Sequence, residues 1–324
     1  MNNSTGKIVT VFGGSGFLGR HVVRALALKG YRVRVAVRRP DLAGFLQPLG
    51  NVGQVMPMQA NLRDANSVAR AVEGADAVVN LVGILYETGK QSFDAVHHIG
   101  ANTIAEAAAR AGISKLVQIS AIGASEESAA GYARSKALGE EAALAAVPSA
   151  IVIRPSLLIG SEDNFFNKFA EMARISPFLP LIGGGLTKFQ PVFVGDVANV
   201  IARGVDGLLK PGATYELGGP DVRTFRELMD MMMAVTHQQR MLLPIPFWLA
   251  GMMGSVFQSL PVTPPLTRDQ VTMLKSDNVV SELAKAEGRT FEGLEINPMA
   301  IEAVIPTYLW SYRSTGQYEA NRVQ

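Results

Sequence analysis

The first thirty residues constrain the fold more than any other part of the chain. An apolar segment, 8–12, runs directly into Gly13-Gly14-Ser15-Gly16-Phe17-Leu18-Gly19, and a helical pattern follows over 16–29. Glycines at this spacing permit a tight turn and a close approach of backbone to a ligand. A helix that begins there offers free N–H groups and the positive end of its dipole. The pattern therefore predicts a phosphate-binding turn, and a tight turn without a ligand is the alternative.

The alternation of strand and helix continues through the first half of the chain. Further apolar segments lie at 32–37, 55–58, 77–81, 116–119 and 151–153, and helical patterns fall between them, notably at 101–110 and 133–146. Such alternation predicts βαβ units with right-handed crossovers and helices on both faces of a parallel sheet. We expect an α/β fold of the Rossmann type, a doubly wound parallel sheet in a domain of residues 1–155 that later segments complete.

The rhythm changes after Arg154-Pro155. Glycine and proline punctuate the chain, as in Gly183-Gly184-Gly185 and Gly218-Gly219-Pro220, while helical patterns persist at 197–205 and 226–234. This composition is typical of excursions from a sheet rather than of an independent domain. We therefore expect residues 156–324 to form a smaller C-terminal lobe.

One stretch of that lobe, 241–267, contains no charged residue. Prolines at 244, 246 and 261 limit any helix within it to 247–260, which is too short to cross a bilayer of the usual thickness. Two readings stay open. The stretch is either a buried helix of the lobe or an apolar docking segment for a partner or a membrane interface.

Composition excludes several classes of function. The 30 Lys and Arg residues against 28 Asp and Glu leave a net charge of +2, which argues against nucleic acid as a partner. The chain has no cysteine, so disulfides, cysteine-ligated metals and thiolate catalysis are excluded. None of the four histidines, at positions 21, 97, 98 and 237, has the spacing of a metal motif, so we expect no metal site, with carboxylate-bound magnesium as the open alternative.

The end of the second strand bears on which nucleotide would bind. NAD sites usually place an acidic residue there for the ribose 2′-hydroxyl, whereas this chain has Arg38 and Arg39. A guanidinium can pair with a 2′-phosphate through charge-assisted hydrogen bonds. We therefore expect Arg38 to select NADP(H), with Arg20 as a second candidate and a solvated surface arginine as the alternative.

Two further segments follow strands at the same edge of the sheet. After the third strand, Asn61 could meet the adenine edge and Leu62 its ring, whereas Asp64 is expected to cap the next helix. Residues 80–83 end the fourth strand, where the backbone has to pass close to a dinucleotide. Each signal is weak alone, but their order along the chain strengthens them together.

Tyr132 and Lys136 are spaced to share one face of a helix. An ammonium beside a phenol favours the phenolate and lowers the pKa of the phenol. Such a tyrosine could give or take a proton beside a nicotinamide. The alternative is an exposed Tyr and Lys at the start of a helix.

The glycine turn and the Tyr–Lys pair together resemble the short-chain dehydrogenase/reductase superfamily, in its extended or atypical branch. Later segments resemble one family in particular, the nucleotide-binding accessory subunit of respiratory complex I, the NADH:ubiquinone oxidoreductase. This similarity extends from about residue 7 to about residue 312. Those segments are Asn80-Leu81-Val82-Gly83, Ile153-Arg154-Pro155-Ser156, Asp163-Asn164-Phe165-Phe166-Asn167, Gln190-Pro191-Val192-Phe193-Val194 and Leu266-Thr267-Arg268-Asp269.

The resemblance implies tightly held NADPH in a structural role and a place among the other subunits of complex I. The family's subunit sits on the peripheral arm near the membrane, supports assembly or stability, and does not carry the main electron path. Carried over by position, the resemblance implies pyrophosphate contacts from Gly13, Ser15, Gly16, Phe17 and Leu18, a 2′-phosphate contact from Arg38, adenine contacts from Asn61 and Leu62, and a dinucleotide wall of Leu81, Val82 and Gly83. Tyr132 and Lys136 would reach the nicotinamide ribose, with Pro155 and Ser156 near the carboxamide.

One departure from the superfamily keeps other functions open. Its enzymes usually place a Ser or Thr after the fifth strand, but here Ser120 falls at the strand end and apolar residues follow, with Ser125 as a possible substitute. The alternatives are a free NADPH-dependent reductase or epimerase that uses Tyr132 and Lys136, and an NADP(H)-sensing regulatory protein.

The N-terminal sequence shows no signal or transit pattern. This favours a bacterial relative, and we expect it to be peripheral on the cytoplasmic side of the inner membrane.

Overall fold

In this computed structural model the described residues are 6–258, 264–314 and 316. The backbone divides into two compact units. Unit 1 comprises Met1–Pro155 and Gly195–Glu216, and unit 2 comprises Ser156–Val194 and Leu217–Gln324.

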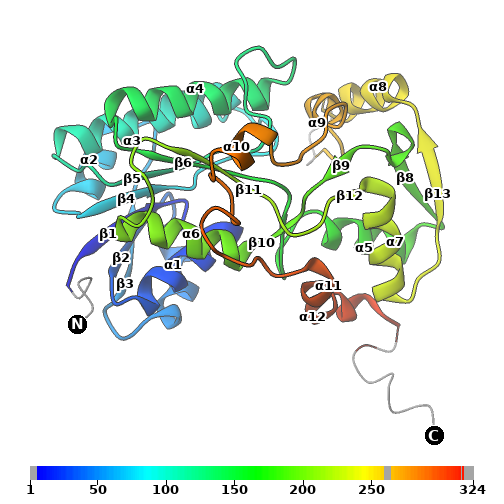
Figure 1. Cartoon of the computed structure of the whole chain (residues 1–324), viewed down its shortest axis with the longest axis horizontal. Coiled ribbons are helices and arrows are strands. Elements are labelled where there is room, and N and C mark those ends of the chain that lie inside the picture. Colours follow the sequence, from blue (N-terminus) through cyan, green and yellow to red (C-terminus); the bar gives the residue numbers. More distant parts are fainter. Residues whose placement is uncertain (1–5, 259–263, 315, 317–324) are drawn as a thin grey trace, which may run out of the picture. The chain divides into compact units, whose positions relative to one another are not determined.

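Unit 1 is built around a seven-stranded sheet (Figure 1). Its strands are β1 (Ile8–Phe12), β2 (Arg32–Val37), β3 (Val55–Gln59), β4 (Ala77–Asn80), β5 (Leu116–Ile119), β6 (Ile151–Pro155) and β11 (Thr214–Leu217). They lie in the order β11-β6-β5-β4-β1-β2-β3, and the pairs from β6 to β3 are parallel. The strand order reverses between β1 and β4, and ligands bind at such switch points in open α/β sheets. The predicted Rossmann-type sheet is confirmed.

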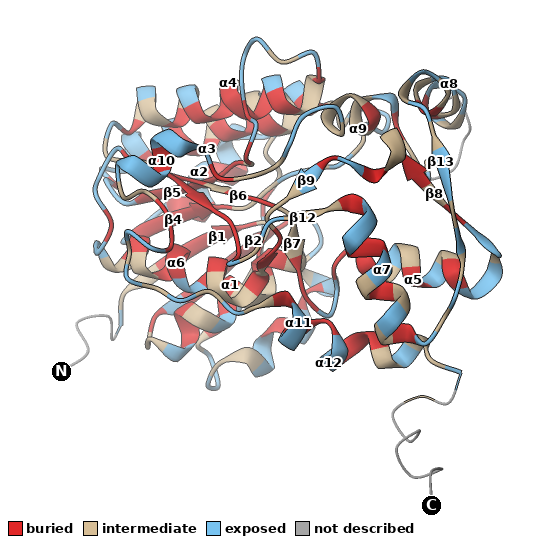
Figure 2. Cartoon of the chain, turned by 45° about the vertical axis from the view of Figure 1, so that its right-hand side comes forward, coloured by how far each residue is buried: buried red, intermediate tan, exposed pale blue. Residues whose placement is uncertain are grey.

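Helices cover both faces of this sheet. In Figure 1, α2 (Ala65–Val72), α3 (Ile99–Arg110) and α4 (Gly131–Ala146) lie on one face, and α1 (Phe17–Leu28) and α6 (Val194–Asp206) lie on the other. The central strands are therefore shielded from both sides and can be apolar throughout. All four residues of β4 and of β5 are buried (Figure 2).

The predicted boundaries differ from the observed ones by a few residues. Strand β4 ends at Asn80 rather than 81, β6 continues through Arg154-Pro155, and α6 begins at Val194 rather than 197. Helix ends depend on hydrogen bonds that a hydrophobic period does not reveal. Where a cap is recognisable, the sequence does locate the end: the Asp64 carboxylate accepts hydrogen bonds from the Asn66 and Ser67 N–H groups and caps α2, as predicted.

Unit 2 consists of short strands and helices around its own core. Its strands pair two by two, β7 with β10, β9 with β12 and β8 with β13. Phe166, Leu228 and Leu309 are completely buried in the core. The strands are β7 (Leu158–Ile159), β8 (Phe178–Ile182), β9 (Lys188–Phe189), β10 (Val192–Phe193), β12 (Arg223–Thr224) and β13 (Met241–Ile245), and the helices are α5 (Phe166–Ile175), α7 (Phe225–Thr236), α8 (Phe247–Gln258), α9 (Arg268–Met273), α10 (Glu282–Ala286), α11 (Ile301–Val304) and α12 (Pro306–Leu309).

The uncharged stretch forms β13 and α8, and residues 259–263 of it lie outside the described residues. Only Ala250 and Gly254 of α8 are buried, whereas Trp248, Met252 and Val256 are 68%, 60% and 60% exposed. The reading of this stretch as a buried helix is therefore wrong for most of α8.

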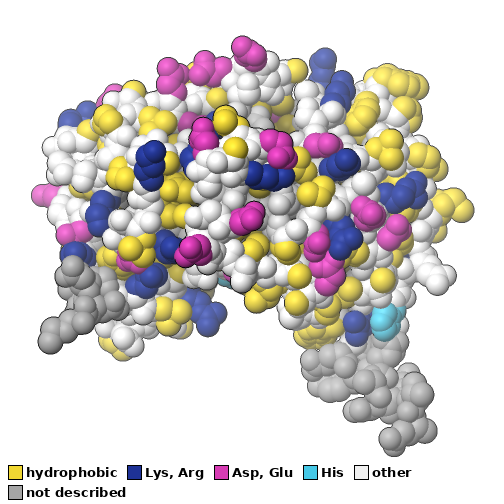
Figure 3. Space-filling model, viewed as in Figure 1, with side chains coloured by type: hydrophobic (Ala, Val, Ile, Leu, Met, Phe, Trp, Pro, Cys, Tyr) yellow, Lys and Arg dark blue, Asp and Glu magenta, His cyan; other side chains and the backbone are white. Residues whose placement is uncertain are grey.

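These three side chains recur every fourth residue and share one side of the helix. We call them, together with the exposed Met241 and Leu243 of β13, the apolar face (Figure 3). None of the helices that the structure describes is both long enough and apolar enough to span a membrane.

Candidate functional site

The glycine turn after β1 is packed so closely that side chains would not fit. Gly13 has a φ of 77°, and a Cβ there would lie 3.1 Å from the Val82 nitrogen. A Cβ on Gly19 would lie 2.3 Å from the Gly13 oxygen. These glycines therefore let the turn approach the backbone after β4 and let α1 begin directly against the turn.

The first turn of α1 has the features of an anion site. Its N-cap is Gly16, no side chain caps the helix, and its first turn has no acidic residue. The leading N–H groups of a helix need partners from a cap, water or a ligand. Backbone N–H groups and the helix dipole at this position fit a pyrophosphate.

A cavity of about 270 Å³ lies beside this turn, at the carboxyl ends of the central strands. It brings together most of the predicted nucleotide contacts, which come from four different strand ends. Those contacts are Gly13, Ser15, Gly16, Arg38, Asn61, Leu62, Leu81, Val82 and Gly83. Phe17 and Leu18 lie in the first turn of α1.

Three cationic side chains line this cavity. Arg38, Arg63 and Lys90 all line it, and Arg38 Nη1 donates a hydrogen bond of 2.6 Å to Gln91 Oε1. Thr88 and Gln91 exchange two backbone hydrogen bonds that form the turn carrying Lys90 and Gln91. No motif marks Arg63, Lys90 or Gln91, so sequence reasoning missed them.

The other two arginines considered are occupied elsewhere. Arg39 pairs with Asp41 at 2.9 Å. The Arg20 guanidinium lies 5.1 Å from the centre of the Phe45 ring. Of the arginines proposed for a 2′-phosphate, Arg38 is the one that lines the cavity.

Tyr132 and Lys136 lie together at the start of α4. The Lys136 ammonium is 5.9 Å from the centre of the Tyr132 ring. Lys136 is only 5% exposed, and burial lowers its pKa to about 8, against the opposing effect of Glu140. The described part of the chain shows no acceptor hydrogen-bonded to this ammonium. An ammonium for which the described residues supply no acceptor, on a side chain that is mostly buried, fits a ligand that brings hydroxyl groups.

Glu140, one turn further along α4, is engaged by Arg154 of β6. The guanidinium donates to both carboxylate oxygens, at 2.9 and 2.6 Å, and lies 3.6 Å from Glu216. Such bidentate pairs are directional and strong. The pairing anchors α4 to the sheet and holds the Glu140 carboxylate on Arg154.

His97 packs against the Tyr132 ring, and the sequence predicts no metal-binding role for it. His97 is 2% exposed. Its Nε2 accepts a hydrogen bond from the Ile84 N–H at 3.0 Å, and its Nδ1 lies 2.9 Å from Ser135 Oγ. Burial, and then the charge of Lys136, lower the pKa of His97 to about 2, so the ring is neutral.

Two serines were considered for the position after the fifth strand. Ser120 directly follows β5, is 4% exposed, and its hydroxyl has no partner among the described residues. Ser125 is exposed and accepts a hydrogen bond from the Glu127 N–H. Ser120 therefore has the buried unpaired hydroxyl of the two. The sequence did not predict this residue as the substrate-orienting serine, because it falls at the strand end and apolar residues follow it.

Pro155 and Ser156 end the predicted set. The Pro155 carbonyl accepts a hydrogen bond from the Ile122 N–H within unit 1. Ser156 belongs to unit 2, where its hydroxyl donates to Asn278 Oδ1 at 2.7 Å and accepts from the Gln190 N–H at 3.2 Å. The Ser156 side chain therefore already has partners within its own unit.

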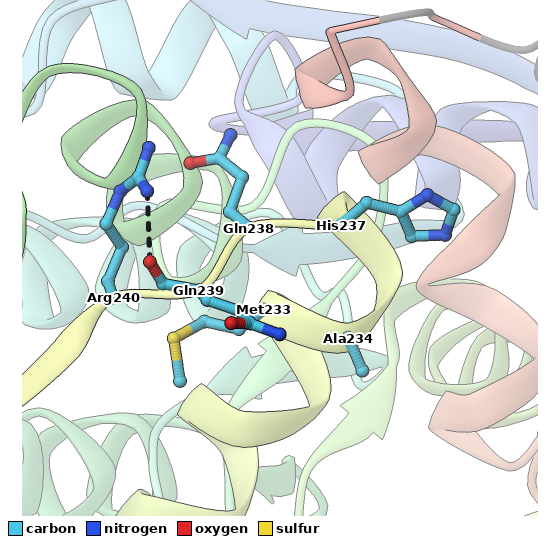
Figure 4. A pocket seen from close by; sticks show the side chains of 6 residues that line it. All are labelled: Met233, Ala234, His237, Gln238, Gln239 and Arg240. Carbon is cyan, nitrogen blue, oxygen red and sulfur yellow. Dashed lines mark hydrogen bonds between the residues drawn. The ribbon is translucent and has the colours of Figure 1, made fainter.

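A second hollow lies at the end of α7 (Figure 4). Its Arg240 is turned onto the backbone, with hydrogen bonds to the carbonyls of Gln239 at 3.0 Å and Ala173 at 2.6 Å. Ala173 lies in the last turn of α5, where a helix presents carbonyl groups that an arginine can satisfy. The Arg240 guanidinium therefore already has backbone partners. In the part of the chain that the structure describes, no cluster of three His, Asp or Glu residues could hold a metal.

Comparison with known proteins shows which family this chain belongs to. The model of the NAD dependent epimerase/dehydratase family matches residues 9–218. The mitochondrial NADH dehydrogenase (ubiquinone) 1 alpha subcomplex subunit 9 of Arabidopsis thaliana is 38% identical, over 96% of this chain and 79% of that protein. The mitochondrial NADH-ubiquinone oxidoreductase 40 kDa subunit of Neurospora crassa is 30% identical, over 97% and 82%.

Solved structures agree on the fold. The NADPH-dependent quinone oxidoreductase of Escherichia coli, in complex with NADPH, superposes with a TM-score of 0.72 at 17% identity, over 92% of this chain and 99% of that one. The resemblance inferred from the motifs is confirmed by these comparisons. The chain belongs to the NAD dependent epimerase/dehydratase family and, within it, to the family of the alpha subcomplex subunit 9 of NADH dehydrogenase (ubiquinone).

Proposed function

We propose that this chain is an accessory subunit of respiratory complex I that holds NADPH in a structural or regulatory role. The similarity to complex I subunits over nearly the whole chain carries the proposal. The cavity beside the glycine turn supports it, because its lining supplies a turn for phosphates and side chains for a ribose and a base. Binding would stabilise the folded subunit and, through it, the peripheral arm of the complex.

The cations that line the cavity support NADPH over NADH. Arg38 is held by Gln91 at 2.6 Å, and Arg63 and Lys90 line the same cavity. Cations attract a 2′-phosphate much more strongly than a neutral 2′-hydroxyl. The turn from Gly13 to Leu18 would then hold the pyrophosphate.

The remaining contacts follow from this orientation. Asn61 and Leu62 would hold the adenine, and Leu81, Val82 and Gly83 would form the wall along the dinucleotide. Tyr132 and Lys136 would meet the nicotinamide ribose. Pro155 and Ser156 would lie near the carboxamide. In this proposal residues 1–155, completed by later segments, form the nucleotide-binding domain, and residues 156–324 form the smaller lobe.

The apolar face is the proposed docking surface of that lobe, within the segment 241–267. Its exposed Trp248, Met252 and Val256 lie in a stretch without charge, and contiguous exposed apolar side chains mark interaction sites. We assign it to the other subunits of complex I, with peripheral membrane contact at its edge. In a bacterial host this places the chain on the cytoplasmic side of the inner membrane.

The decisive test is an affinity purification of the full chain from gently solubilised native membranes, with mass spectrometry of both proteins and nucleotides. Stoichiometric complex I subunits and one NADPH per chain are expected. Recovery of the chain alone from the soluble fraction would refute the accessory role. Trp248→Ser combined with Met252→Ser should abolish co-purification while leaving NADPH content unchanged, because the apolar face lies in unit 2 and the cavity in unit 1.

A second candidate, a free NADPH-dependent reductase, is favoured by one observation. The buried Ser120 hydroxyl has no partner among the described residues, and Lys136 likewise shows no acceptor. In such an enzyme NADPH would supply the hydride to a carbonyl carbon, the Tyr132 hydroxyl would give the proton to the oxygen, and Ser120 would orient that oxygen. Tyr132→Phe should then abolish turnover of NADPH with carbonyl substrates, and unchanged turnover would exclude this chemistry.

A further inference from the structure

His97 is a buried side chain that the proposed function leaves without a role. It lies in a π-helical turn, Asp94–His98, immediately before α3, and such turns are common at functional sites. Its ring stacks on Phe93, with centroids 5.6 Å apart and an interplanar angle of 22°, and meets the Tyr132 ring edge-on at 5.2 Å. Packing on two sides therefore fixes the plane of the imidazole.

The hydrogen bonds of this ring form a directed chain. The Ile84 N–H donates to Nε2 at 3.0 Å, so Nε2 carries no proton and Nδ1 does. Nδ1–H then donates to Ser135 Oγ at 2.9 Å, and the Ser135 hydroxyl donates to the Tyr132 carbonyl at 2.8 Å. This tautomer is assigned from the partners. The chain joins the backbone after β4 to the first turn of α4.

The same ring lies next to the Lys136 ammonium. A Cβ on Gly83 would be 3.2 Å from Lys136 Nζ and 3.6 Å from His97 Nε2, so both groups lie against one backbone position of the cavity wall. Burial first, and then repulsion from the neighbouring Lys136 ammonium, keep the ring neutral.

The other charged groups near this ring are occupied. His98 and Asp94 pair with each other at 2.9 Å. On α4, Glu140 is held by Arg154. Lys136 is therefore the cation that faces the ring.

We propose that His97 is a positioning residue: by binding Ile84 on one side and Ser135 on the other, it fixes the Tyr132–Lys136 pair against the cavity wall at Gly83. The proposal rests on the proposed nucleotide-binding function and refines it. His97 would act through Lys136 on the ribose beside the nicotinamide. The adenosine half, held at Arg38 and Asn61, would be independent of it.

Two probes separate the halves of the ligand. NADPH spans both, whereas adenosine 2′,5′-bisphosphate carries only the adenosine half with its 2′-phosphate. His97→Phe keeps a ring but loses both hydrogen bonds. In titrations of the full chain we expect NADPH affinity to fall tenfold or more, and affinity for the bisphosphate to stay within twofold.

The matched control is His98→Phe, the same change one residue along the chain, where the side chain is 37% exposed. It should change neither affinity. Unchanged NADPH affinity in folded His97→Phe would overturn the proposal. Equal weakening of both probes would also overturn it, because a merely structural role would affect both halves.

Two further variants keep the test decisive if His97→Phe does not fold. Ser135→Ala breaks the same chain from α4 by removing one oxygen, and should show the same selective loss for NADPH. His97→Gln places an amide oxygen where it can accept the Ile84 N–H, and should recover part of the affinity. An unmutated chain that binds neither probe would refute the proposed function itself, and this inference with it.

Discussion

Two buried side chains near the strand ends of unit 1 differ in their hydrogen bonding from the buried Asp163 of unit 2. In unit 1 the groups nearest the strand ends lack protein partners: the described residues offer no acceptor to the Lys136 ammonium and no partner to the Ser120 hydroxyl. In unit 2, Asp163 accepts hydrogen bonds from the N–H groups of Phe165, Phe166 and Asn167. A buried polar group without a partner costs stability, and one with partners contributes to it.

We relate this difference in hydrogen bonding to function. An ammonium that has no acceptor in the protein is retained when a bound ligand supplies the acceptor, and active sites are commonly less stable than they could be for this reason. In unit 2 the Asp163 carboxylate is saturated by backbone N–H groups and the Tyr308 hydroxyl, although Arg223 Nε and Gln238 Oε1 are buried without a partner among the described residues. What unit 2 presents outward is apolar, as its exposed Trp248 and Met252 show. We therefore expect mutations in unit 1 to act on nucleotide affinity and mutations in unit 2 to act on stability or docking.

The largest expected effect is that of Asp163→Ala. It would orphan four backbone N–H groups, including that of Gly160, and the hydroxyl of Tyr308. We expect a loss of about 3 kcal/mol or more in the free energy of unfolding, measured by urea denaturation. NADPH affinity should not change under conditions where the variant is folded. Asp221→Ala, which removes a half-exposed carboxylate 3.8 Å from Arg223, is the control. A loss of NADPH affinity in the folded Asp163 variant would break the comparison.

Lys136→Met should act in the opposite direction on stability and affinity. It removes a buried ammonium for which the described residues supply no acceptor, so the ligand-free protein should melt at a higher temperature. It also removes the proposed charged hydrogen-bond donor to the ribose, worth about 1.5–3 kcal/mol, so NADPH affinity should fall roughly 10- to 100-fold. Lys285→Met, at an exposed lysine paired with Glu282, should do neither. A Lys136 variant that is less stable and still binds NADPH would show that the ammonium is structural.

Arg38→Glu should affect one nucleotide selectively. A carboxylate would face the 2′-phosphate across the position that Arg38 shares with Gln91, so NADPH affinity should fall about 10- to 30-fold, equivalent to about 2 kcal/mol. NADH, which has no 2′-phosphate, should bind at least as well as before. Arg39→Glu is the matched control because Arg39 pairs with Asp41 instead. Equal loss of both nucleotides would contradict the assignment of Arg38.

Most strands of the sheet could be predicted because a short run of adjacent residues signals a strand. Six of the seven strands coincide with predicted apolar segments, β4 and β5 to within one residue, whereas β11, with the sequence Thr214-Tyr215-Glu216-Leu217, was not predicted. The glycine spacing and the Tyr132–Lys136 spacing are also local patterns, and their geometry follows from a turn and a helix face. These parts of the site could be located without knowing how distant segments meet.

The remainder of the site depends on tertiary contacts. Lys90 and Gln91 reach the cavity because a turn closes between Thr88 and Gln91 and brings Gln91 to Arg38, and no sequence period encodes that contact. No motif marks His97 in the sequence, yet it is 2% exposed and contacts Tyr132. Helix α8 is apolar on nearly every side, so its sequence could not tell which side packs. The structure shows that Ala250 and Gly254 do.

The smallest expected effect is a pH dependence that belongs to Lys136 alone. Its pKa in the folded, ligand-free protein is lowered to about 8 from 10.5 by burial. Between these values the unfolded chain holds more protons at this position than the folded chain, so this residue makes the ligand-free protein more stable as the pH rises. NADPH affinity should move oppositely, falling by up to about tenfold per pH unit above pH 8 as the ammonium loses its proton.

Opposite slopes of melting temperature and affinity from pH 7 to 9 are therefore the signature of a group kept unpaired for a ligand. Lys136→Met should remove this residue's contribution to both slopes. Parallel slopes, or slopes that survive in Lys136→Met, would mean that unit 1 pairs its ammonium internally as unit 2 pairs its carboxylate. The contrast between the two units would then fail at the residue on which it depends most.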